Sequence, residues 1–226
     1  LFLNLYEANK AFFSSEIAVM ENILVAGANG TTGKKIVDLL AASQYFNPVA
    51  MVRKESQKKQ FEDKNIATVL ADLEKDVSHT TKNIDKIIFA AGSGGKNVEA
   101  VDQEGAKKMI DAGKKSNVRK FVMLSSMGAD NPESSEELKD YLKAKQNADI
   151  YLIESKLPYS IIRPGALKDE KGKGKIELSN KLNKSGKISR DDVAQTLVHV
   201  LHDSSAINNT FEIIEGETLI GKAIPS

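Results

Sequence analysis

The feature that most constrains the fold is an alternation of short apolar runs with longer amphipathic segments, which begins at Asn22 and continues along the chain. Several runs are unbroken series of Ile, Val, Leu and Phe, as expected of parallel strands that are covered on both faces. The alternation is the βαβ pattern, so we predict an α/β fold with a three-layer, doubly wound parallel sheet. The predicted strands are Ile23–Ala26, Val49–Val52, Thr68–Leu70, Lys86–Ala90, Lys120–Leu124, Tyr159–Arg163 and Thr210–Ile214.

Amphipathic segments between these runs predict the helices. Their apolar side chains recur at near-helical spacing. Ser189 stands just before the last of these segments and is its predicted N-cap. The predicted helices are Gly33–Ala42, Val98–Ser116, Ser134–Ser155 and Asp191–His202.

Composition excludes several classes of function. Lys plus Arg number 32 and Asp plus Glu 31, and this net charge of +1 gives no reason to expect a nucleic-acid or anionic-membrane partner. The chain has no cysteine and three histidines, so we expect no disulfide, no cysteine nucleophile and no metal site. No run approaches the roughly 18 to 20 apolar residues that a membrane helix needs, and we expect a cytoplasmic protein.

A glycine-rich turn directly follows the first predicted strand and opens the first predicted helix. From Gly27 to Gly33 it reads G-x-x-G-x-x-G. Glycines permit a tight turn and close approach of the backbone, so a pyrophosphate can bind the N–H groups at the helix N-terminus, where the helix dipole favours negative charge. The turn is not a P-loop, because Gly33-Lys34-Lys35 lacks the Ser or Thr and the glycine spacing of that motif. We therefore predict a dinucleotide-binding Rossmann fold, with Gly33 also allowing close helix–sheet packing and with cofactor contacts from Gly27, Asn29, Gly30, Thr31, Thr32 and Gly33.

The residue after the second strand distinguishes the two nicotinamide dinucleotides. Folds that take NAD place an acid there, about 20 residues past the glycines, to bind the ribose hydroxyls. This chain has Arg53 and Lys54 at that point. A guanidinium pairs bidentately with a 2′-phosphate that an acid would repel, so we predict NADP(H) in preference to NAD(H).

The end of the third strand is predicted to lie beside the adenine ring. It carries the sequence Ala71-Asp72-Leu73. Asp72 could accept a hydrogen bond from the adenine amine, with Leu73 next to it, or it could cap a helix. Both roles of Asp72 are compatible with the sequence.

The order and spacing of several short motifs resemble the short-chain dehydrogenase/reductase superfamily over about Met20 to Ile220. More narrowly, the chain resembles the atypical branch with NmrA-like and biliverdin-reductase-B-like members, NAD(P)-binding proteins often labelled NAD-dependent epimerase/dehydratase. Besides the glycine turn, the motifs are FAAG at 89–92, VDQEGA at 101–106, FVMLSS at 121–126, YLKAK at 141–145 and IIRPGAL at 161–167. The resemblance implies further cofactor contacts from Ala90, Ala91, Gly92, Pro164 and Gly165, the last two beside the nicotinamide.

The resemblance also implies an active site. Tyr141 and Lys145 match the family's Y-x-x-x-K pair, and their spacing of four places both on one helix face. The lysine cation would stabilise the phenolate and would also hold the nicotinamide ribose. Ser126 would bind the substrate carbonyl, with Ser125 as its neighbour or substitute. Asp102 stands where better-studied relatives have an Asn, which alters any proton relay through that position.

A single domain is predicted for residues 20–226: an NAD(P)-binding Rossmann domain with a small C-terminal lobe on the substrate side. Residues 1–19 are predicted to be an N-terminal extension, either non-native or a docking helix that covers an apolar patch. The Lys- and Gly-rich segment 168–175 is predicted to be either a mobile lid or a solvated loop, and its charge favours the loop.

Three functions follow from this reading. The first is an NADP(H)-dependent oxidoreductase that transfers hydride to a small carbonyl, quinone or flavin-like acceptor. The second is a non-catalytic NADP(H)-binding redox sensor of the NmrA-like kind. The third is a sugar-nucleotide epimerase or dehydratase, which the short segment after Gly165 disfavours. The expected partner is a small-molecule substrate, and the resemblance also allows a homodimer because long exposed helices of this superfamily commonly pair.

Overall fold

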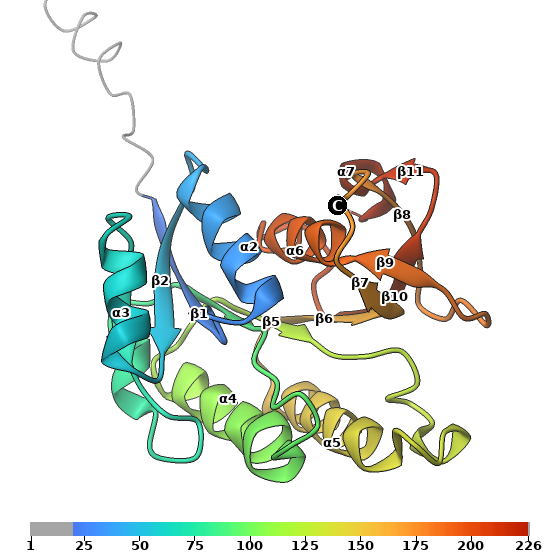
Figure 1. The fold of residues 1–226 in the computed structure, drawn as a ribbon, viewed down its shortest axis with the longest axis horizontal. Helices are drawn as coiled ribbons and strands as arrows, with labels where there is room; N and C mark the ends of the chain where they lie inside the picture. Colours follow the sequence, from blue (N-terminus) through green and yellow to red (C-terminus); the bar gives the residue numbers. More distant parts are fainter. Residues whose placement is uncertain (1–19, 226) are drawn as a thin grey trace, which may run out of the picture.

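A nine-stranded, mainly parallel sheet divides the molecule into layers (Figure 1). The structure is a computed structural model and describes residues 20–225. The strand order is β11-β8-β10-β6-β5-β4-β1-β2-β3, so the chain reverses direction across the sheet between β1 and β4, as in a Rossmann fold. The strands are β1 (Glu21–Ala26), β2 (Phe46–Val52), β3 (Ala67–Leu70), β4 (Lys86–Phe89), β5 (Lys120–Leu124), β6 (Tyr159–Pro164), β8 (Lys175–Ser179), β10 (Asn209–Glu215) and β11 (Thr218–Leu219).

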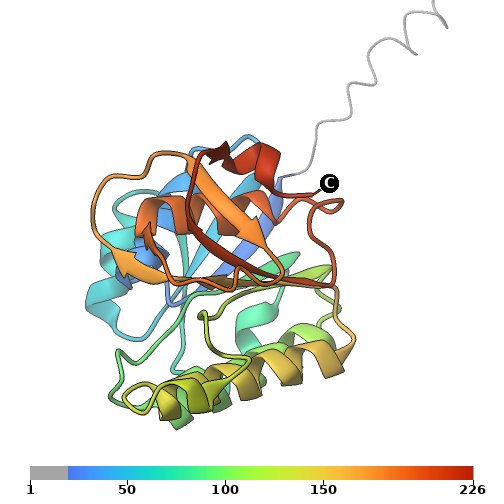
Figure 2. The ribbon, with the colours of Figure 1, turned by 90° about the vertical axis from the view of Figure 1, so that its right-hand side faces the viewer.

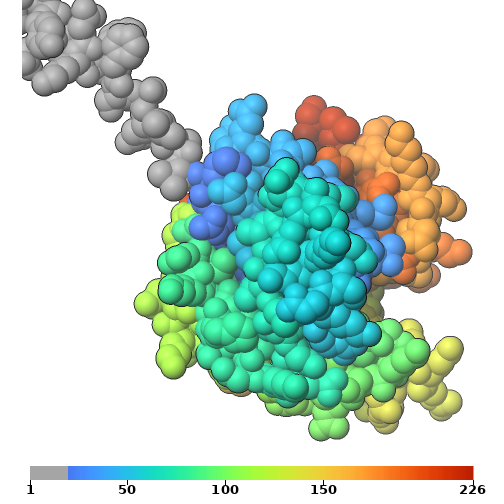
Figure 3. Space-filling model, turned by 60° about the vertical axis from the view of Figure 1, so that its left-hand side comes forward, coloured from blue at the N-terminus to red at the C-terminus, as the bar shows by residue number. Residues whose placement is uncertain are grey.

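Helices cover both faces of the sheet. Figure 2 shows α4 and α5 on one side of it and α2 and α6 on the other. In Figure 3 the teal residues of α3 and the segments around it face the viewer, with the orange C-terminal lobe away to one side. The helices are α2 (Thr31–Ala41), α3 (Glu55–Glu62), α4 (Gly105–Lys115), α5 (Lys139–Ser155), α6 (Arg190–His199) and α7 (Ile220–Ala223), with short turns η1 (Ser78–Thr81), η2 (Val98–Glu104) and η3 (Pro132–Ser134).

The apolar runs are unbroken because successive side chains of each strand enter two different cores. In β1, Ile23 and Val25 pack with α2 and α6, whereas Leu24 and Ala26 pack with α4 and α5. All four are fully buried. This two-sided burial confirms the predicted three-layer α/β sheet.

Residues after β6 build the small C-terminal lobe. Two short strands, β7 (Ala166–Lys168) and β9 (Lys187–Ser189), pair in parallel as a separate two-stranded sheet. At the edge of the main sheet, β8 runs antiparallel to both β10 and β11. The lobe therefore extends the sheet beyond β6 on the side away from β3.

Each of the seven predicted strands corresponds to an observed strand, but the helix boundaries differ: α2 begins at Thr31, two residues before the predicted start, and the other three helices differ more. The segment 98–116 begins with the π-helix η2 and continues as α4. The helix predicted from Ser134 begins at Lys139, because the Ser134 hydroxyl donates to the Asn131 carbonyl and the Ser135 hydroxyl accepts from the Leu138 amide, which holds a turn. The helix predicted to reach His202 ends at His199, since lysines of the sheet bind the Leu201 and His202 carbonyls.

The sequence did not predict α3 or the strands of the lobe other than β10. The predicted N-cap is confirmed, because the Ser189 hydroxyl accepts from the Asp192 amide at the start of α6. The predicted extension or docking helix of residues 1–19 lies outside the described residues. Within the part that is described, no helix has the length and apolar character needed to cross a membrane.

Candidate functional site

The glycine turn joins β1 to α2 at the carboxyl edge of the sheet. Gly27 has a φ of +89°, and a Cβ there would lie 2.6 Å from Ala91 at the end of β4. A Cβ on Gly33 would overlap the Gly27 carbonyl. The predicted close packing at Gly33 is thus against the turn itself, not the strands. The turn touches Ala90 and Ala91, which brings two predicted groups of cofactor contacts together.

The first turn of α2 leaves polar groups available for an anion. Its N-cap residue, Gly30, has no side chain to cap the helix, and the first turn carries no acidic residue. The first intrahelical bond runs from the Lys34 amide to the Gly30 carbonyl, so the amides of Thr31, Thr32 and Gly33 precede the hydrogen-bonded ladder. Asn29 keeps a buried Oδ1 without a partner among residues 20–225. These groups fit a dinucleotide diphosphate.

Arg53 and Lys54 follow β2 with exposed side chains. The Gln57 Oε1 accepts from both of their backbone amides, at 3.0 and 3.1 Å, and so fixes the turn that carries them. Within residues 20–225, neither side chain lies within 4.0 Å of a carboxylate. Two unpaired cations on a fixed turn fit a phosphate group.

Asp72 caps a turn in the structure. Its Oδ1 accepts from the Glu74 amide at 3.1 Å, and the Lys75 amide bonds to its carbonyl. Of the two roles left open by the sequence, capping is present, although the element capped is a turn and not a helix. Leu73 is buried against Gly105 at the start of α4.

Tyr141 and Lys145 lie together on α5, as their spacing predicted. The Lys145 Nζ is 5.6 Å from the centre of the Tyr141 ring. Only 3% of Lys145 is exposed, and its ammonium donates to the Leu124 carbonyl at 3.3 Å. The lysine charge is therefore held at the end of β5, beside the phenol.

Asp102 lies on η2 and faces the same lysine. Its Oδ1 is 3.3 Å from the Lys145 Nζ, and both side chains are almost completely buried. Its Oδ2 accepts from the Ser93 amide at 2.9 Å, which fixes the segment after Gly92. An Asn at this position would carry no charge. Asp102 therefore neutralises much of the lysine's field.

The structure distinguishes the two serines that the sequence left open. Ser125 is buried, and its hydroxyl donates to Asp149 Oδ2 at 2.8 Å. Ser126 is half-buried, and its hydroxyl donates to the Met127 carbonyl at 3.2 Å, a contact that a ligand can replace. Ser126 is thus the more accessible of the two serines.

The turn after β6 is held by its own chain. The Met127 amide donates to the Pro164 carbonyl at 3.0 Å, and the Gly165 amide donates to the Ile213 carbonyl at 2.9 Å. A Cβ on Gly165 would overlap the carbonyl of Gly186. Internal packing already requires glycine here, and the contact with a nicotinamide stays a prediction.

The sequence analysis did not identify two side chains of the site, the buried acid Asp149 and the guanidinium of Arg163 in the IIRPGAL motif. Asp149 is 1% exposed, and its Oδ2 receives Nε and Nη2 of Arg163 at 3.0 and 2.9 Å. Its spacing of four after Lys145 on one helix face was the available signal. Burial raises the pKa of the Asp149 carboxyl, while the Arg163 charge and the Ser125 hydroxyl oppose that rise.

The loop 168–175 is anchored to α6. The amides of Gly172, Lys173 and Gly174 donate to the carboxylates of Asp191 and Asp192, at 2.7 to 3.1 Å. Lys168 and Lys173 both pair with Glu215, and these hydrogen bonds lower the pKa of Glu215 to about 2. The loop is solvent-facing but tied down, which disfavours the lid interpretation.

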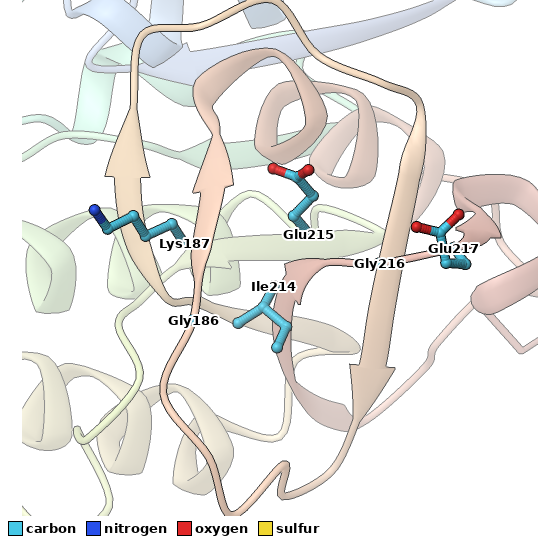
Figure 4. Close-up of a pocket in the computed structure, with 6 residues that line it drawn as sticks. All are labelled: Gly186, Lys187, Ile214, Glu215, Gly216 and Glu217. Carbon is cyan, nitrogen blue, oxygen red and sulfur yellow. The ribbon is translucent and has the colours of Figure 1, made fainter.

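A cavity of about 270 Å³ lies in the C-terminal lobe (Figure 4). None of the predicted site residues lines it. Its lining comes from the ends of β9 and β10 and the turn that follows β10: Gly186, Lys187, Ile214, Glu215, Gly216 and Glu217. This cavity is therefore separate from the glycine turn and the Tyr141–Lys145 pair.

Comparison with known proteins defines the class. A family model described as NAD(P)H-binding matches residues 27–204, and the chain belongs to this family. The predicted resemblance to the atypical short-chain dehydrogenase/reductase branch is confirmed.

Individual relatives cover nearly the whole domain. The chain is 40% identical over 210 residues to the uncharacterized sugar epimerase YhfK of Bacillus subtilis, which spans 89% of this chain and 98% of YhfK. A putative NAD-dependent epimerase/dehydratase from Bacillus halodurans is 35% identical, with a TM-score of 0.86 over 89% of this chain and 97% of its own. The oxidoreductase ylbE from Lactococcus lactis is 32% identical, with a TM-score of 0.81 over 89% and 94%.

Proposed function

We propose that the chain is an NADP(H)-dependent oxidoreductase that reduces a small carbonyl, quinone or flavin-like acceptor. The observation that carries the proposal is the buried Lys145 beside the Tyr141 ring, on the same sheet edge as the glycine turn. An NAD(P)H-binding family and an oxidoreductase-named relative support a redox role. The partner would be the small-molecule acceptor.

Tyr141, Lys145 and Ser126 are suited to a reaction in which one acceptor receives both a hydride and a proton. When bound, the reduced nicotinamide supplies the hydride to carbon. Tyr141 gives its phenolic proton to the acceptor oxygen, and Lys145 stabilises the phenolate that remains. Ser126 donates to the same oxygen and orients it. The reduced acceptor leaves with both electrons and the proton, and solvent returns the proton to Tyr141.

The test is consumption of NADPH with a panel of quinones, flavins, aldehydes and, for the epimerase alternative, nucleotide sugars. NADPH should raise the melting temperature under any of the three functions, by mass action. We expect the wild type to oxidise NADPH with at least one acceptor of the panel. Tyr141→Phe should lower the rate of this oxidation by about 100-fold and leave the affinity for NADPH unchanged. Tyr45→Phe, an exposed tyrosine outside the site, is the matched control.

The cofactor preference can be tested separately at Arg53. In Arg53→Glu the acid would repel a 2′-phosphate, so the Kd of NADPH should rise by about 10- to 100-fold while that of NADH changes little. Isothermal titration with both nucleotides measures this. An unchanged ratio of the two affinities would remove the case for NADP(H), and Arg190→Glu controls for loss of a positive charge elsewhere.

One observation favours the second candidate, a redox sensor that binds NADP(H) without turnover. Asp102 neutralises the lysine that should stabilise the phenolate. A sensor would show the thermal shift with NADPH and no oxidation across the whole panel. Asp102→Asn would then be expected to gain activity, because the lysine charge is released.

A further inference from the structure

We propose that Asp149 is a positioning residue that fixes α5, and with it Tyr141 and Lys145, against the ends of β5 and β6. This inference rests on the proposed function and adds a residue to it. Asp149 touches neither the acceptor nor the cofactor in this proposal. It acts through the groups that it holds.

The contacts of Asp149 join three elements at one atom. Its Oδ2 receives the Ser125 hydroxyl at 2.8 Å and Nε and Nη2 of Arg163 at 3.0 and 2.9 Å. Ser125 directly precedes Ser126, and Arg163 directly precedes Pro164. One carboxylate oxygen thus ties the helix of the proton donor to the strand ends that carry the acceptor-binding serine and the Pro164–Gly165 turn.

The charges around Asp149 form a balanced buried set. Asp102 on η2 faces Lys145 on α5, one turn before Asp149, and Arg163 on β6 completes two acids and two bases. Asp130, in the loop before η3, lies 4.0 Å from Arg163 and pairs with Lys181 of the lobe. The Lys145 ammonium of this set is 5.6 Å from the centre of the Tyr141 ring. Loss of the Asp149 charge leaves the buried set with one excess positive charge beside that phenol.

Stability alone does not account for this arrangement. A buried ion pair seldom stabilises a fold more than apolar residues of similar size would, and in some proteins such a pair instead specifies one geometry. The second oxygen of Asp149 is buried and has no hydrogen-bond partner among residues 20–225. A contact that served packing only would not need a charged group with an unused acceptor. The position of α5 relative to Ser126 is what the contact specifies.

The experiment compares Asp149→Asn with the wild-type full chain in the NADPH oxidation assay. The asparagine keeps the size of the side chain and an oxygen that can accept hydrogen bonds, but it loses the negative charge of Asp149. We expect kcat to fall at least about 10-fold while the Kd of NADPH stays within about twofold, because the glycine turn lies on other strands. We also expect the fall of kcat on the basic side of its pH profile to move to lower pH, since excess positive charge favours the phenolate.

Asp111→Asn is the matched control. Asp111 on α4 accepts the Tyr151 hydroxyl of α5 at 2.9 Å, so it also ties α5 to a neighbour, but on the exposed surface. Its kcat and pH profile should equal those of the wild type. A loss of folded protein would lower kcat equally at every pH. A shift of the pH profile along the pH axis therefore distinguishes a positioning role from a loss of folded protein.

Ser125→Ala is the second variant if Asp149→Asn fails to fold. It keeps the charge of Asp149 and removes one of its partners, so kcat should fall several-fold with an unchanged basic limb. Wild-type kcat in both variants, or in Ser125→Ala alone where Asp149→Asn does not fold, overturns the positioning role and leaves the proposed function intact. A wild-type chain that binds NADPH and oxidises none of it overturns both.

Discussion

The two edges of the sheet both bury lysines, yet they use them differently. At the carboxyl edge, Lys145 has one carbonyl and one carboxylate partner. At the amino edge, Lys86 and Lys120 stand side by side on β4 and β5. Lys86 binds Glu21, Asp203 and the Leu201 carbonyl, and Lys120 binds the carbonyls of His202 and Ser205.

The difference separates a structural arrangement from a functional one. The amino-edge lysines hold the segment after α6 against the sheet, and each of their contacts is internal to the chain. The carboxyl edge combines open helix amides, glycines in close contact and a half-buried serine. Substitutions at one edge should therefore affect ligand binding, and those at the other should affect unfolding.

Gly33→Ala should have the largest effect, and it acts at the carboxyl edge. The new Cβ would overlap the Gly27 carbonyl, so the turn must open and its amides must move away from the phosphate position. We expect the Kd of NADPH to rise by about 100-fold or more, since amide geometry carries the anion site. Fluorescence titration of NADPH measures this.

Gly30→Ala is the comparison for that variant. A Cβ at Gly30 would lie 3.2 Å from the same carbonyl, which a small shift can relieve. Its effect on NADPH affinity should be several-fold smaller than that of Gly33→Ala. Equal losses in the two variants would mean that the turn does not bind the diphosphate through a fixed geometry.

Lys86→Met tests the amino edge. It removes the buried partner of Glu21 and Asp203, whose side chains are 20% and 64% exposed and so keep part of their hydration. The free energy of unfolding should fall by about 2–3 kcal/mol, below the usual cost of breaking a fully buried pair. The Kd of NADPH should not change. Urea unfolding and titration calorimetry give the two quantities.

An exposed ion pair supplies the control for Lys86→Met. Lys64 and Asp38 pair at 3.1 Å with both side chains 59% exposed. Lys64→Met should cost less than about 1 kcal/mol, because water screens such a pair. A Lys86 variant as stable as the Lys64 variant, or one with altered NADPH affinity, contradicts the division between the two edges.

The sheet was predictable because strands that are buried on both faces need continuous runs of apolar residues, which are visible in the sequence. Elements that lack this two-sided burial are hard to predict. In α3 the one buried side chain is Phe61, which leaves no apolar stripe to detect. Strands β7 and β9 are three residues long and lie in a Lys- and Gly-rich region, so their pairing depends on the fold around them.

The candidate site was predictable where its parts are close in sequence. The glycine turn and the Tyr141–Lys145 pair are local patterns, and both form in the structure as expected. The partners of Asp149 lie 24 and 14 residues away along the chain, and only the packing of α5 on the sheet brings them together. Likewise, nothing in the sequence indicates that the lysines opening β4 and β5 are buried.

The last effect, a pH dependence of stability that is absent at neutral pH, sharpens the comparison at Lys120. Burial, together with the charge of nearby Lys86, lowers the pKa of Lys120 from 10.5 to about 8. Between these two values the unfolded chain holds a proton that the folded chain has released, so the free energy of unfolding should rise with pH from about 8 to 10.5. Below about pH 8 Lys120 is protonated in both the folded and the unfolded state, so the free energy of unfolding does not change with pH through this group.

The matched measurement is urea unfolding of the wild type and Lys120→Met at intervals from pH 7 to about 10. The variant leaves the His202 and Ser205 carbonyls without the lysine, a loss that does not depend on pH. The difference in stability between the two proteins should therefore be constant up to about pH 8 and should then grow in favour of the wild type. A constant difference over the whole range would show that Lys120 titrates normally and that burial at the amino edge does not perturb its charge.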